Sequence, residues 1–397
     1  MRAGVLSGWS GNGRIADMKP IRKIIVAPDS FKGSLSAIEA CEAAVEAAAI
    51  AVPDCVVVPV PVADGGEGTV DCFAAAMPEA RRQSWTVSGP FGEPLVVQGL
   101  VADGTAVLEM AACAGLPLVE GRANPLATTT YGVGEMIARA VEAGCRRIVL
   151  GLGGSCTNDG GAGMAAALGV VFRDDQGRPF VPVGGTLSRI ADYDATDAAA
   201  RLTGVEISAM CDVVSPMHGP DGAAHVFAPQ KGASPADVAV LDAGLRHLDA
   251  VMTCKRGNSV AGIPGAGAAG AMGAGVLAFL GGALKPGVDT VLDVTGFDNQ
   301  LIGADWVFTG EGRIDGQSAR GKVVSGVARR AKAAGVPVVA FGGSVEAGAE
   351  SLRELGVTAM FGINRTVGTF EQVRGRAREN FRDTVLAVLQ VFARLAR

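Results

Sequence analysis

The densest group of residues that could do chemistry lies at 151–163, where the sequence reads GLGGSCTNDGGAG. An apolar run at 147–150 precedes this segment and an alanine-rich run at 164–168 follows it, which predicts a strand, a glycine-rich loop and a helix. Such a loop directs peptide N–H groups and a helix N-terminus towards an anion, so we expect it to bind phosphate. Asp159 in the same loop is available for metal or proton chemistry. The predicted ligand contacts are Gly153, Gly154, Ser155, Thr157 and Asn158.

Two loops near the N-terminus also combine carboxylates with glycines, each after an apolar run typical of a strand. They read PDSFKGS at 28–34 and ADGGEG at 63–68. Open α/β sheets bind ligands at the carboxyl edge of their strands, which is where both loops are expected to lie. In the first loop the predicted contacts to substrate or phosphate are Asp29, Ser30 and Lys32. In the second loop the predicted Mg²⁺ ligands are Asp64 and Glu67.

A fourth segment places a carboxylate near the end of an apolar run, at Asp212 in AMCDV. A carboxylate at a strand end can act as a general base or a metal ligand. The nearby sequence FAPQKG at 227–232 offers Gln230 and Lys231 in a loop, where they are expected to bind substrate or nucleotide.

The glycines Gly265, Gly267 and Gly270 form a G-x-G-x-x-G pattern. A dinucleotide site also needs a preceding strand and an acidic residue about 20 positions later. Asp289 lies near that offset, but the preceding stretch 258–264 is a poor strand. We therefore expect a buried glycine-rich helix whose N-terminus faces phosphate or substrate, and no membrane span over 265–284.

The last chemistry-bearing segment reads TGEGRIDGQSARGK at 309–322. It matches G-x-x-x-x-G-K, but Val323 replaces the hydroxyl residue that would bind Mg²⁺, so the Walker A motif is incomplete. The segment is expected to form a loop after a strand and to bind phosphate or carboxylate. Its predicted functional residues are Glu311, Arg313, Asp315 and Lys322, with Asp315 as a metal ligand.

Composition excludes several classes of function. A formal charge of −5 and an aromatic content of 5% do not favour nucleic acid as a partner. Eight cysteines without a C-x-x-C pair indicate a reduced, cytoplasmic protein, in which Cys156 is expected to be a small packing residue. Three histidines without metal-ligand spacing argue against a zinc site, and the lack of G-x-S-x-G argues against a hydrolase triad.

Strand-like and helix-like segments alternate along the chain, which predicts an α/β fold with a largely parallel sheet. A length of 397 residues suggests two domains. We expect a discontinuous domain from 20–84 and 301–397, with an inserted mixed-sheet domain at 85–300. Residues 1–19 are expected to form a disordered extension without a signal peptide, and Met18 is an alternative start.

Together these segments resemble the type I glycerate kinases of bacteria. The matching stretches, in the family's order, are APDSFKGSLSA, PVADGGEGTVD, GLGGSCTNDGGAGMAAALG, FAPQKGA, PGAGAAGAMGAGVLAFLGG and TGEGRIDGQSARGK. The resemblance implies phosphorylation of D-glycerate by ATP and Mg²⁺, usually giving 2-phosphoglycerate, in a cleft between two α/β domains, one of them flavodoxin-like. Departures from the family pattern are Cys156, Ala228 and the stretch 215–218, which reads SPMH.

On this basis Mg²⁺ is expected to be held by a subset of the four acidic residues Asp64, Glu67, Asp159 and Asp315. Asp212 is the first choice of base and Asp159 the second, while Lys32, Arg313 or Lys322 would neutralise the substrate carboxylate or the transferring phosphate. An NAD-dependent hydroxyacid dehydrogenase and a non-catalytic sugar-acid sensor are the alternatives. We expect no nucleic acid or membrane partner and a monomer or homodimer; the sequence leaves open which hydroxyl is phosphorylated.

Overall fold

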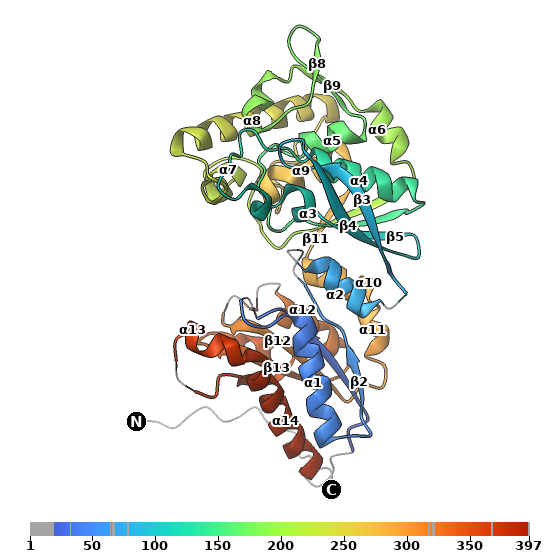
Figure 1. The fold of residues 1–397 in the computed structure, drawn as a ribbon, viewed down its shortest axis with the longest axis vertical. Helices are drawn as coiled ribbons and strands as arrows, with labels where there is room; N and C mark the ends of the chain where they lie inside the picture. The colour runs from blue at the N-terminus through green and yellow to red at the C-terminus, as the bar shows by residue number, and fades with distance from the viewer. Residues whose placement is uncertain are drawn as a thin grey trace.

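The chain folds into two lobes, each built around its own β-sheet, and the computed structural model places both ends of the described chain in one of them (Figure 1). The structure describes residues 20–31, 33–63, 65, 68–77, 79–316, 318–319, 322–366 and 368–395. The elements of the lobe that holds both ends come from the two termini of the sequence, and the elements of the other lobe come from its middle.

The first lobe contains a sheet in which every strand pair is parallel. Its strands are β1 (Lys23–Pro28), β2 (Val56–Pro59), β12 (Trp306–Ile314), β13 (Val338–Val345) and β14 (Val357–Gly362). The spatial order β2-β1-β12-β13-β14 is the flavodoxin-like order, which reverses direction between β1 and β12. This order confirms the expected α/β class. It also marks the carboxyl ends of β1 and β12 as the place where such sheets bind ligands.

Helices cover both faces of the parallel sheet, which explains why its strands are apolar runs. On one face α1 (Ala37–Ala51) and α14 (Ala377–Leu395) pack against Ile24, Phe308 and Phe341. On the other face α12 (Val323–Ala333) packs against the opposite side chains of the same strands. A capping box fixes the start of α1, because the Glu39 N–H donates to Ser36 Oγ and the Ser36 N–H donates to Glu39 Oε2.

The second lobe contains a mixed sheet, as predicted. Its six strands have the spatial order β11-β10-β6-β5-β4-β3. They are β3 (Arg81–Ser88), β4 (Pro94–Ala102), β5 (Thr105–Glu109), β6 (Arg147–Gly151), β10 (Glu206–Met210) and β11 (Ala283–Lys285). The strands β5, β6, β10 and β11 run parallel, while β3 and β4 add an antiparallel edge. The carboxyl ends of β6 and β10 therefore lie side by side.

One face of the mixed sheet is covered by α4 (Tyr131–Glu142), α5 (Ala162–Leu168) and α9 (Ala268–Phe279). The remaining helices of this lobe are α3 (Ala111–Ala114), α6 (Thr196–Arg201), α7 (Ala223–Phe227) and α8 (Pro235–Arg256). A small antiparallel sheet contains β7 (Val171–Arg173), β8 (Pro179–Phe180) and β9 (Asp192–Asp194). Short 3₁₀ turns complete the connections. The apolar run that includes α9 is buried, and no helix in the described chain is long and apolar enough to cross a membrane.

The two lobes share an apolar core. Between them lie α2 (Thr69–Ala76), α10 (Gly287–Val294) and α11 (Phe297–Gln300), as Figure 1 shows. Val107 and Val149 on the second face of the mixed sheet belong to the same apolar cluster as Val291 of α10 and Val324 of α12. The predicted boundary at residue 85 falls within β3, so we propose that the inserted segment begins before Arg81.

Candidate functional site

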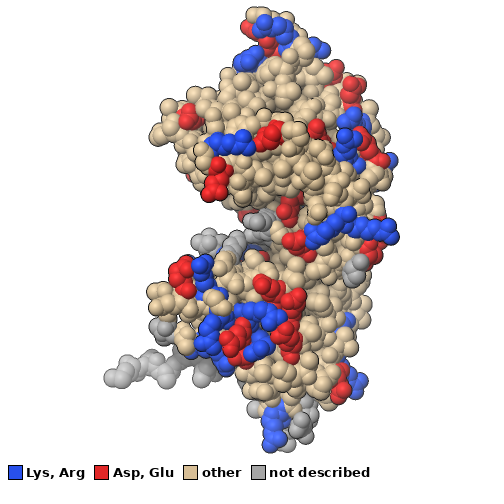
Figure 2. Space-filling view, viewed as in Figure 1, with Lys and Arg blue, Asp and Glu red and all other residues tan. Residues whose placement is uncertain are grey.

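Two cavities open between the lobes, where Figure 2 shows the molecule hollowed. The larger cavity, about 930 Å³, lies at the carboxyl ends of β1, β12, β13 and β14. The smaller cavity, about 330 Å³, lies at the carboxyl ends of β6 and β10. Asp212 lines both cavities, and it is the described residue that they share. Each sheet thus presents its strand ends to a common space.

Asp212 is held in place by the first turn of α10. Its Oδ1 accepts a hydrogen bond from the Gly287 N–H at 2.9 Å. Gly287 is the first residue of α10, the helix that packs against the first lobe, while the strand before Asp212, β10, belongs to the second. The carboxylate is therefore fixed at the start of α10 and exposed to the cleft.

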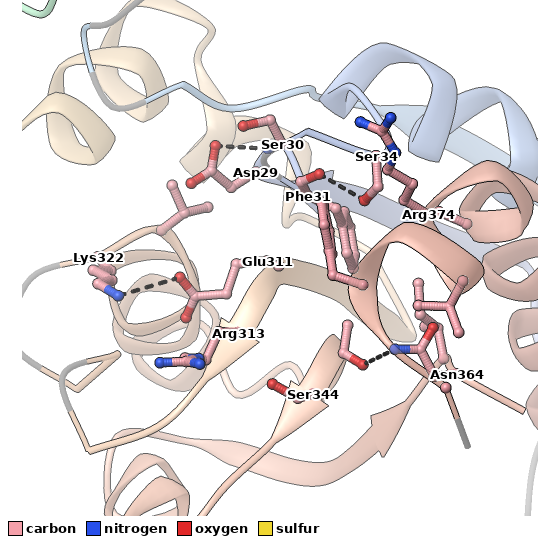
Figure 3. Close-up of a pocket in the computed structure, with 18 of the residues that line it drawn as sticks. Asp29, Ser30, Phe31, Ser34, Glu311, Arg313, Lys322, Ser344, Asn364 and Arg374 are labelled. Carbon is pink, nitrogen blue, oxygen red and sulfur yellow. Dashed lines mark hydrogen bonds and ion pairs between the residues drawn. The ribbon is translucent and has the colours of Figure 1, made fainter. Parts of the chain in front are cut away.

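Charged side chains gather at one end of the larger cavity (Figure 3). Asp29 is buried, and its Oδ1 accepts from the Ser30 N–H at 2.6 Å. Lys322 Nζ lies 4.0 Å from Glu311 Oε2, and Arg313 Nε lies 3.1 Å from Glu346 Oε1. This end of the cavity can hold phosphate oxygens through Lys322 and Arg313.

The structure corrects one expectation for this segment. Glu311 and Arg313 do not lie in a loop, because β12 extends to Ile314 and pairs with β13 through Arg313 and Ser344. Residues two apart in a strand point to the same face, so Glu311 and Arg313 reach the cavity together. Asp315, the predicted metal ligand, follows the strand and does not line either cavity.

The other end of the larger cavity was not predicted from the sequence. It is formed by Ser344, Ile363, Asn364, Phe370, Val373, Arg374 and Ala377. These residues follow β13 and β14 or belong to α13 (Phe370–Val373) and the turns around it. None of the six stretches used above includes them. The signal that could have found them is position, because Ser344 and Asn364 lie at the carboxyl ends of two parallel strands.

The smaller cavity is built around Lys231, which is almost completely buried at 2% exposure. Its ammonium group donates to Ser155 Oγ at 2.8 Å and to the Thr157 carbonyl at 2.7 Å. Among the described residues no carboxylate lies within ion-pair distance of it. Burial lowers the pKa of Lys231 to about 8, against the attraction of Cys156 and Asp159. A buried cation whose protein contacts are neutral oxygens is costly unless an anion joins it, so this cavity fits an anionic ligand.

Several predicted contacts share this cavity with Lys231. The predicted contacts Gly153, Gly154, Ser155 and Gln230 line it, together with Ala268 and Ala269 from the glycine-rich segment. Cys156 is buried in the same loop, and burial raises the pKa of its thiol to about 12. Its thiol is therefore protonated at neutral pH, as expected for a packing residue.

Thr157 and Asn158 lie behind the cavity and are fully buried. Thr157 Oγ1 and both polar side-chain atoms of Asn158 have no hydrogen-bond partner among the described residues. Buried polar atoms normally have partners, and leaving them without any is costly. Their predicted role as ligand contacts stays a prediction, and their polar atoms are available for it.

Asp159 does not reach either cavity, although sequence reasoning placed it among the bases and metal ligands. It is completely buried, and its carboxylate accepts hydrogen bonds from the Thr130 N–H and Oγ1 at 2.8 Å, from the Gly161 N–H at 3.1 Å and from the Gly163 N–H at 3.3 Å. Burial raises its pKa, while these donors oppose the rise. Such contacts favour a role in shaping the loop between β6 and α5.

The G-x-G-x-x-G glycines serve close packing. A Cβ on Gly267 would lie 2.2 Å from the Pro216 carbonyl oxygen, and one on Gly270 would lie 2.0 Å from the Thr157 carbonyl oxygen. Gly265 packs against Cys211 in the same way. Turns precede these glycines where a dinucleotide site needs a strand, so the dehydrogenase alternative loses its main motif.

The ADGGEG loop contacts the 151–163 loop through Gly65. The Gly153 N–H donates to the Gly65 carbonyl at 2.9 Å, and a Cβ on Gly151 would lie 2.7 Å from that oxygen. Glycine at 151 thus permits the two predicted phosphate and metal loops to touch. Lys32, Asp64 and Glu67 lie outside the described residues.

The carboxylates present can accommodate Mg²⁺ bound to a nucleotide. Within the described ranges no group of three or more His, Cys, Asp or Glu side chains could hold a metal by itself. Mg²⁺ in kinase sites is usually bound by one or two carboxylates together with substrate phosphates. Asp29, Asp212 and Glu311 line the larger cavity beside Lys322, which fits that pattern.

Comparison with known proteins agrees with this geometry. The sequence model described as the glycerate kinase family matches residues 24–393. The chain is 44% identical to the glycerate kinase of Bacillus cereus over 93% of its length and 98% of the relative's. It is 43% identical to the glycerate 2-kinase of Escherichia coli strain K12, covering 90% of this chain and 94% of that one.

A crystal structure from Salmonella typhimurium LT2 that is assigned as a glycerate kinase 2 superposes with a TM-score of 0.83 at 38% identity, covering 94% of this chain and 98% of that chain. The resemblance drawn from the six sequence stretches is therefore confirmed. This chain belongs to the glycerate kinase family and is an enzyme of the kinase class.

Proposed function

We propose that this protein transfers the γ-phosphate of ATP to D-glycerate and forms 2-phosphoglycerate, with Mg²⁺, in the cleft between the lobes. Family membership supports the reaction, and the relative named glycerate 2-kinase supports phosphorylation at the 2-hydroxyl. The observation that carries the proposal is the sharing of Asp212 by two cavities of unequal size. A phosphoryl group passing between two bound substrates needs such a junction.

The sizes of the cavities suggest which substrate each one takes. The larger, about 930 Å³, lies at the upper end of the usual range for ligand sites and suits a nucleotide. The smaller, about 330 Å³, suits glycerate, whose carboxylate would balance the buried ammonium group of Lys231. Glycerate bound there would place a hydroxyl beside Asp212, which lines the same cavity.

In this arrangement the Asp212 carboxylate accepts the proton of the attacking glycerate hydroxyl. The oxygen then forms a bond to the γ-phosphorus as the bond to the leaving ADP oxygen breaks, with the two oxygens in line. Lys322 and Arg313 neutralise the negative charge of the transferring group. Because most of the catalysis is positioning and charge stabilisation, no covalent nucleophile is required.

Asp29 and Glu311 are the described residues best placed to hold Mg²⁺, together with the predicted ligands Asp64 and Glu67. Bound Mg²⁺ supplies charge neutralisation to the phosphate oxygens. All eight cysteines are free thiols, which supports the proposed cytoplasmic location. Whether the protein is a monomer or a homodimer stays a prediction.

The product identifies the reaction directly. The purified protein is incubated with ATP, MgCl₂ and D-glycerate, and phosphorus NMR follows the mixture, with L-glycerate and enzyme-free samples as controls. We expect ADP and the resonance of 2-phosphoglycerate in equal amounts. Formation of 3-phosphoglycerate would contradict the proposed regiochemistry, and the absence of both phosphoglycerates would contradict the function.

A further inference from the structure

We propose that the end of the larger cavity away from Asp212 binds the base of the nucleotide, with Phe370 and Arg374 as its recognition residues. This inference rests on the proposed function, because it assigns a ligand group to a part of the same site. It concerns residues that lie outside the chemistry-bearing motifs of the sequence.

The larger cavity changes character from one end to the other. Figure 3 shows Lys322 and Glu311 on the side opposite Arg374 and Asn364. The charged end also contains Asp29, whereas the other end combines Arg374 and Asn364 with the apolar residues Ile363, Phe370, Val373 and Ala377. A nucleotide has the same polarity, with a triphosphate at one end and a planar base at the other. Glycerate lacks apolar surface and would leave this end empty.

Phe370 is an aromatic side chain at this end of the cavity. It is 53% exposed although it lines a cavity. Its ring is fixed on one side by Gly33, because a Cβ at that position would lie 3.3 Å from the ring carbon Cζ. A capping box fixes the start of α13, where the Thr369 N–H donates to Gln372 Oε1 at 2.9 Å. The ring is therefore held in place with much of its surface available for stacking.

Arg374 lies four residues after Phe370, on the same side of the helical turn. Its Nε is 2.8 Å from Glu371 Oε2, which holds the side chain beside the cavity. Asn364 is also fixed, because its Nδ2 donates to the Gly343 carbonyl at 2.8 Å. A flat ring, a guanidinium plane and an amide are the groups that recognise the face and edge of a base.

The test compares nucleotide with triphosphate. Titration calorimetry measures the dissociation constants of ATP and of inorganic tripolyphosphate, both with Mg²⁺, and steady-state kinetics measure the KM values for ATP and glycerate. The variants are Phe370→Ala and Arg374→Gln. Phe361→Ala is the matched control, since Phe361 is a half-exposed phenylalanine on β14 that does not line either cavity. Circular dichroism checks that each variant is folded.

We expect Phe370→Ala to weaken ATP binding by about 5- to 100-fold, which is the usual loss for one base stacked on an aromatic ring. Arg374→Gln is expected to weaken ATP binding by a smaller factor, and both variants should leave tripolyphosphate affinity and the KM for glycerate unchanged. Equal weakening of ATP and tripolyphosphate would overturn the proposal, because these residues would then bind phosphate. Unchanged ATP affinity, or an increased KM for glycerate alone, would also overturn it.

The calorimetry separates this inference from the proposed reaction. If the wild-type protein binds ATP but does not phosphorylate glycerate, the proposed function fails while the base site remains supported by the variants. If it phosphorylates glycerate and Phe370→Ala behaves as the control does, the base site fails alone.

Discussion

Lys231 has surroundings that differ strongly from those that a lysine side chain favours. An ammonium group in water makes strong contacts with solvent, yet this one is buried and donates to a hydroxyl and a carbonyl oxygen. The groups that influence its charge are Cys156, which is protonated at neutral pH, and Asp159, which lies beyond ion-pair distance. A bound glycerate carboxylate would supply the missing counter-ion.

The pH dependence of catalysis tests this role. Because the pKa of Lys231 is lowered to about 8, the free enzyme carries the cation below that pH and loses it above. Protonation of Lys231 should therefore leave kcat/KM for glycerate constant below pH 8. Above pH 8 we expect kcat/KM to fall about tenfold per pH unit. Initial rates measured from pH 6 to 10 at saturating ATP check this.

The matched variant for this profile is Lys231→Met, which keeps the length of the side chain and removes the charge. It should raise the KM for glycerate at least about 100-fold and abolish the alkaline decrease. The same pKa shift predicts that the free energy of unfolding rises with pH between about 8 and 10.5, because the unfolded chain then holds a proton that the folded chain has released. An alkaline decrease that persists in Lys231→Met would contradict the assignment.

At the residue scale, sequence reasoning found the groups that follow strand ends in glycine-rich loops. Asp29, Asp212, Lys231 and Lys322 all line a cavity. It did not find Phe370 or Arg374, because they come from a segment whose composition resembles an ordinary surface turn. The role of Asp159 as base or metal ligand stays a prediction: its carboxylate accepts hydrogen bonds from peptide N–H groups of its own loop, an arrangement that looks the same in a sequence as one that faces a ligand.

Among the elements, the start of α9 contains unusual backbone strain. Ala269 and Ala271 have φ values of 55° and 66°, on either side of Gly270 at 69°. Alanine in this left-handed region costs about 1–2 kcal/mol relative to a right-handed conformation. Ala269 lines the smaller cavity, and such strain is often found at ligand sites. Gly270 allows this turn to pack closely against the 151–163 loop at Thr157.

Replacing Ala269 with glycine should relieve part of this strain. We expect Ala269→Gly to raise the free energy of unfolding by about 0.5–1 kcal/mol, because glycine adopts positive φ without a steric penalty. Urea denaturation provides the measurement. The control is Ala49→Gly on the exposed side of α1, which should lower stability by about 0.5–1 kcal/mol. A loss of stability in both variants would mean that the alanine methyl at 269 contributes more than the strain.

Element boundaries were the least predictable level of the fold. The sequence predicts a loop over 309–322, but β12 runs to Ile314. Glycine at 310 and 312 suggested a loop. Pairing with β13 instead continues through this stretch, because glycine at 310 permits close approach of Phe341. Tertiary pairing, which the local sequence does not reveal, decided the length of the strand.

For the whole molecule, the connection between the lobes depends on α10 and α11. Arg330 of α12 joins both helices, with ion pairs to Asp293 at 2.6 Å, Asp298 at 3.2 Å and Asp289 at 3.6 Å. The arginine side chain is 19% exposed, so it is partly shielded from solvent. Since α10 begins at the residue that donates to Asp212, this cluster also supports the position of the proposed base.

Removal of Arg330 should therefore affect stability and turnover together. We expect Arg330→Ala to lower the free energy of unfolding by about 1–2 kcal/mol, because three carboxylates lose a common cation but remain mostly exposed. A several-fold decrease in kcat should accompany this loss. The neighbouring Arg329→Ala, which removes a 3.9 Å contact to Asp289, is the control and should change stability by less than about 0.5 kcal/mol. Equal effects in both variants would contradict the proposed connection.

The overall architecture was largely predictable, since alternating apolar and glycine-rich segments define an α/β fold and the closely spaced strands at 81–109 indicate a mixed sheet. The shared apolar core was not. Val149 and Val291 carry no sequence signal that they meet, because the contact depends on how the two sheets are oriented. The cleft, and the sharing of Asp212 by both cavities, follow from that orientation.

The most direct test of the account is a measurement of catalysis and binding in Asp212→Asn. Asparagine can still accept from the Gly287 N–H, so the fold should be kept, while the proton acceptor is lost. Glu206→Gln, an exposed carboxylate at the opposite end of β10, is the control. We predict that kcat falls about 10²- to 10⁴-fold while calorimetric dissociation constants for ATP and glycerate change less than about threefold. A kcat near the wild-type value would contradict the assignment of Asp212 as the base between the two cavities.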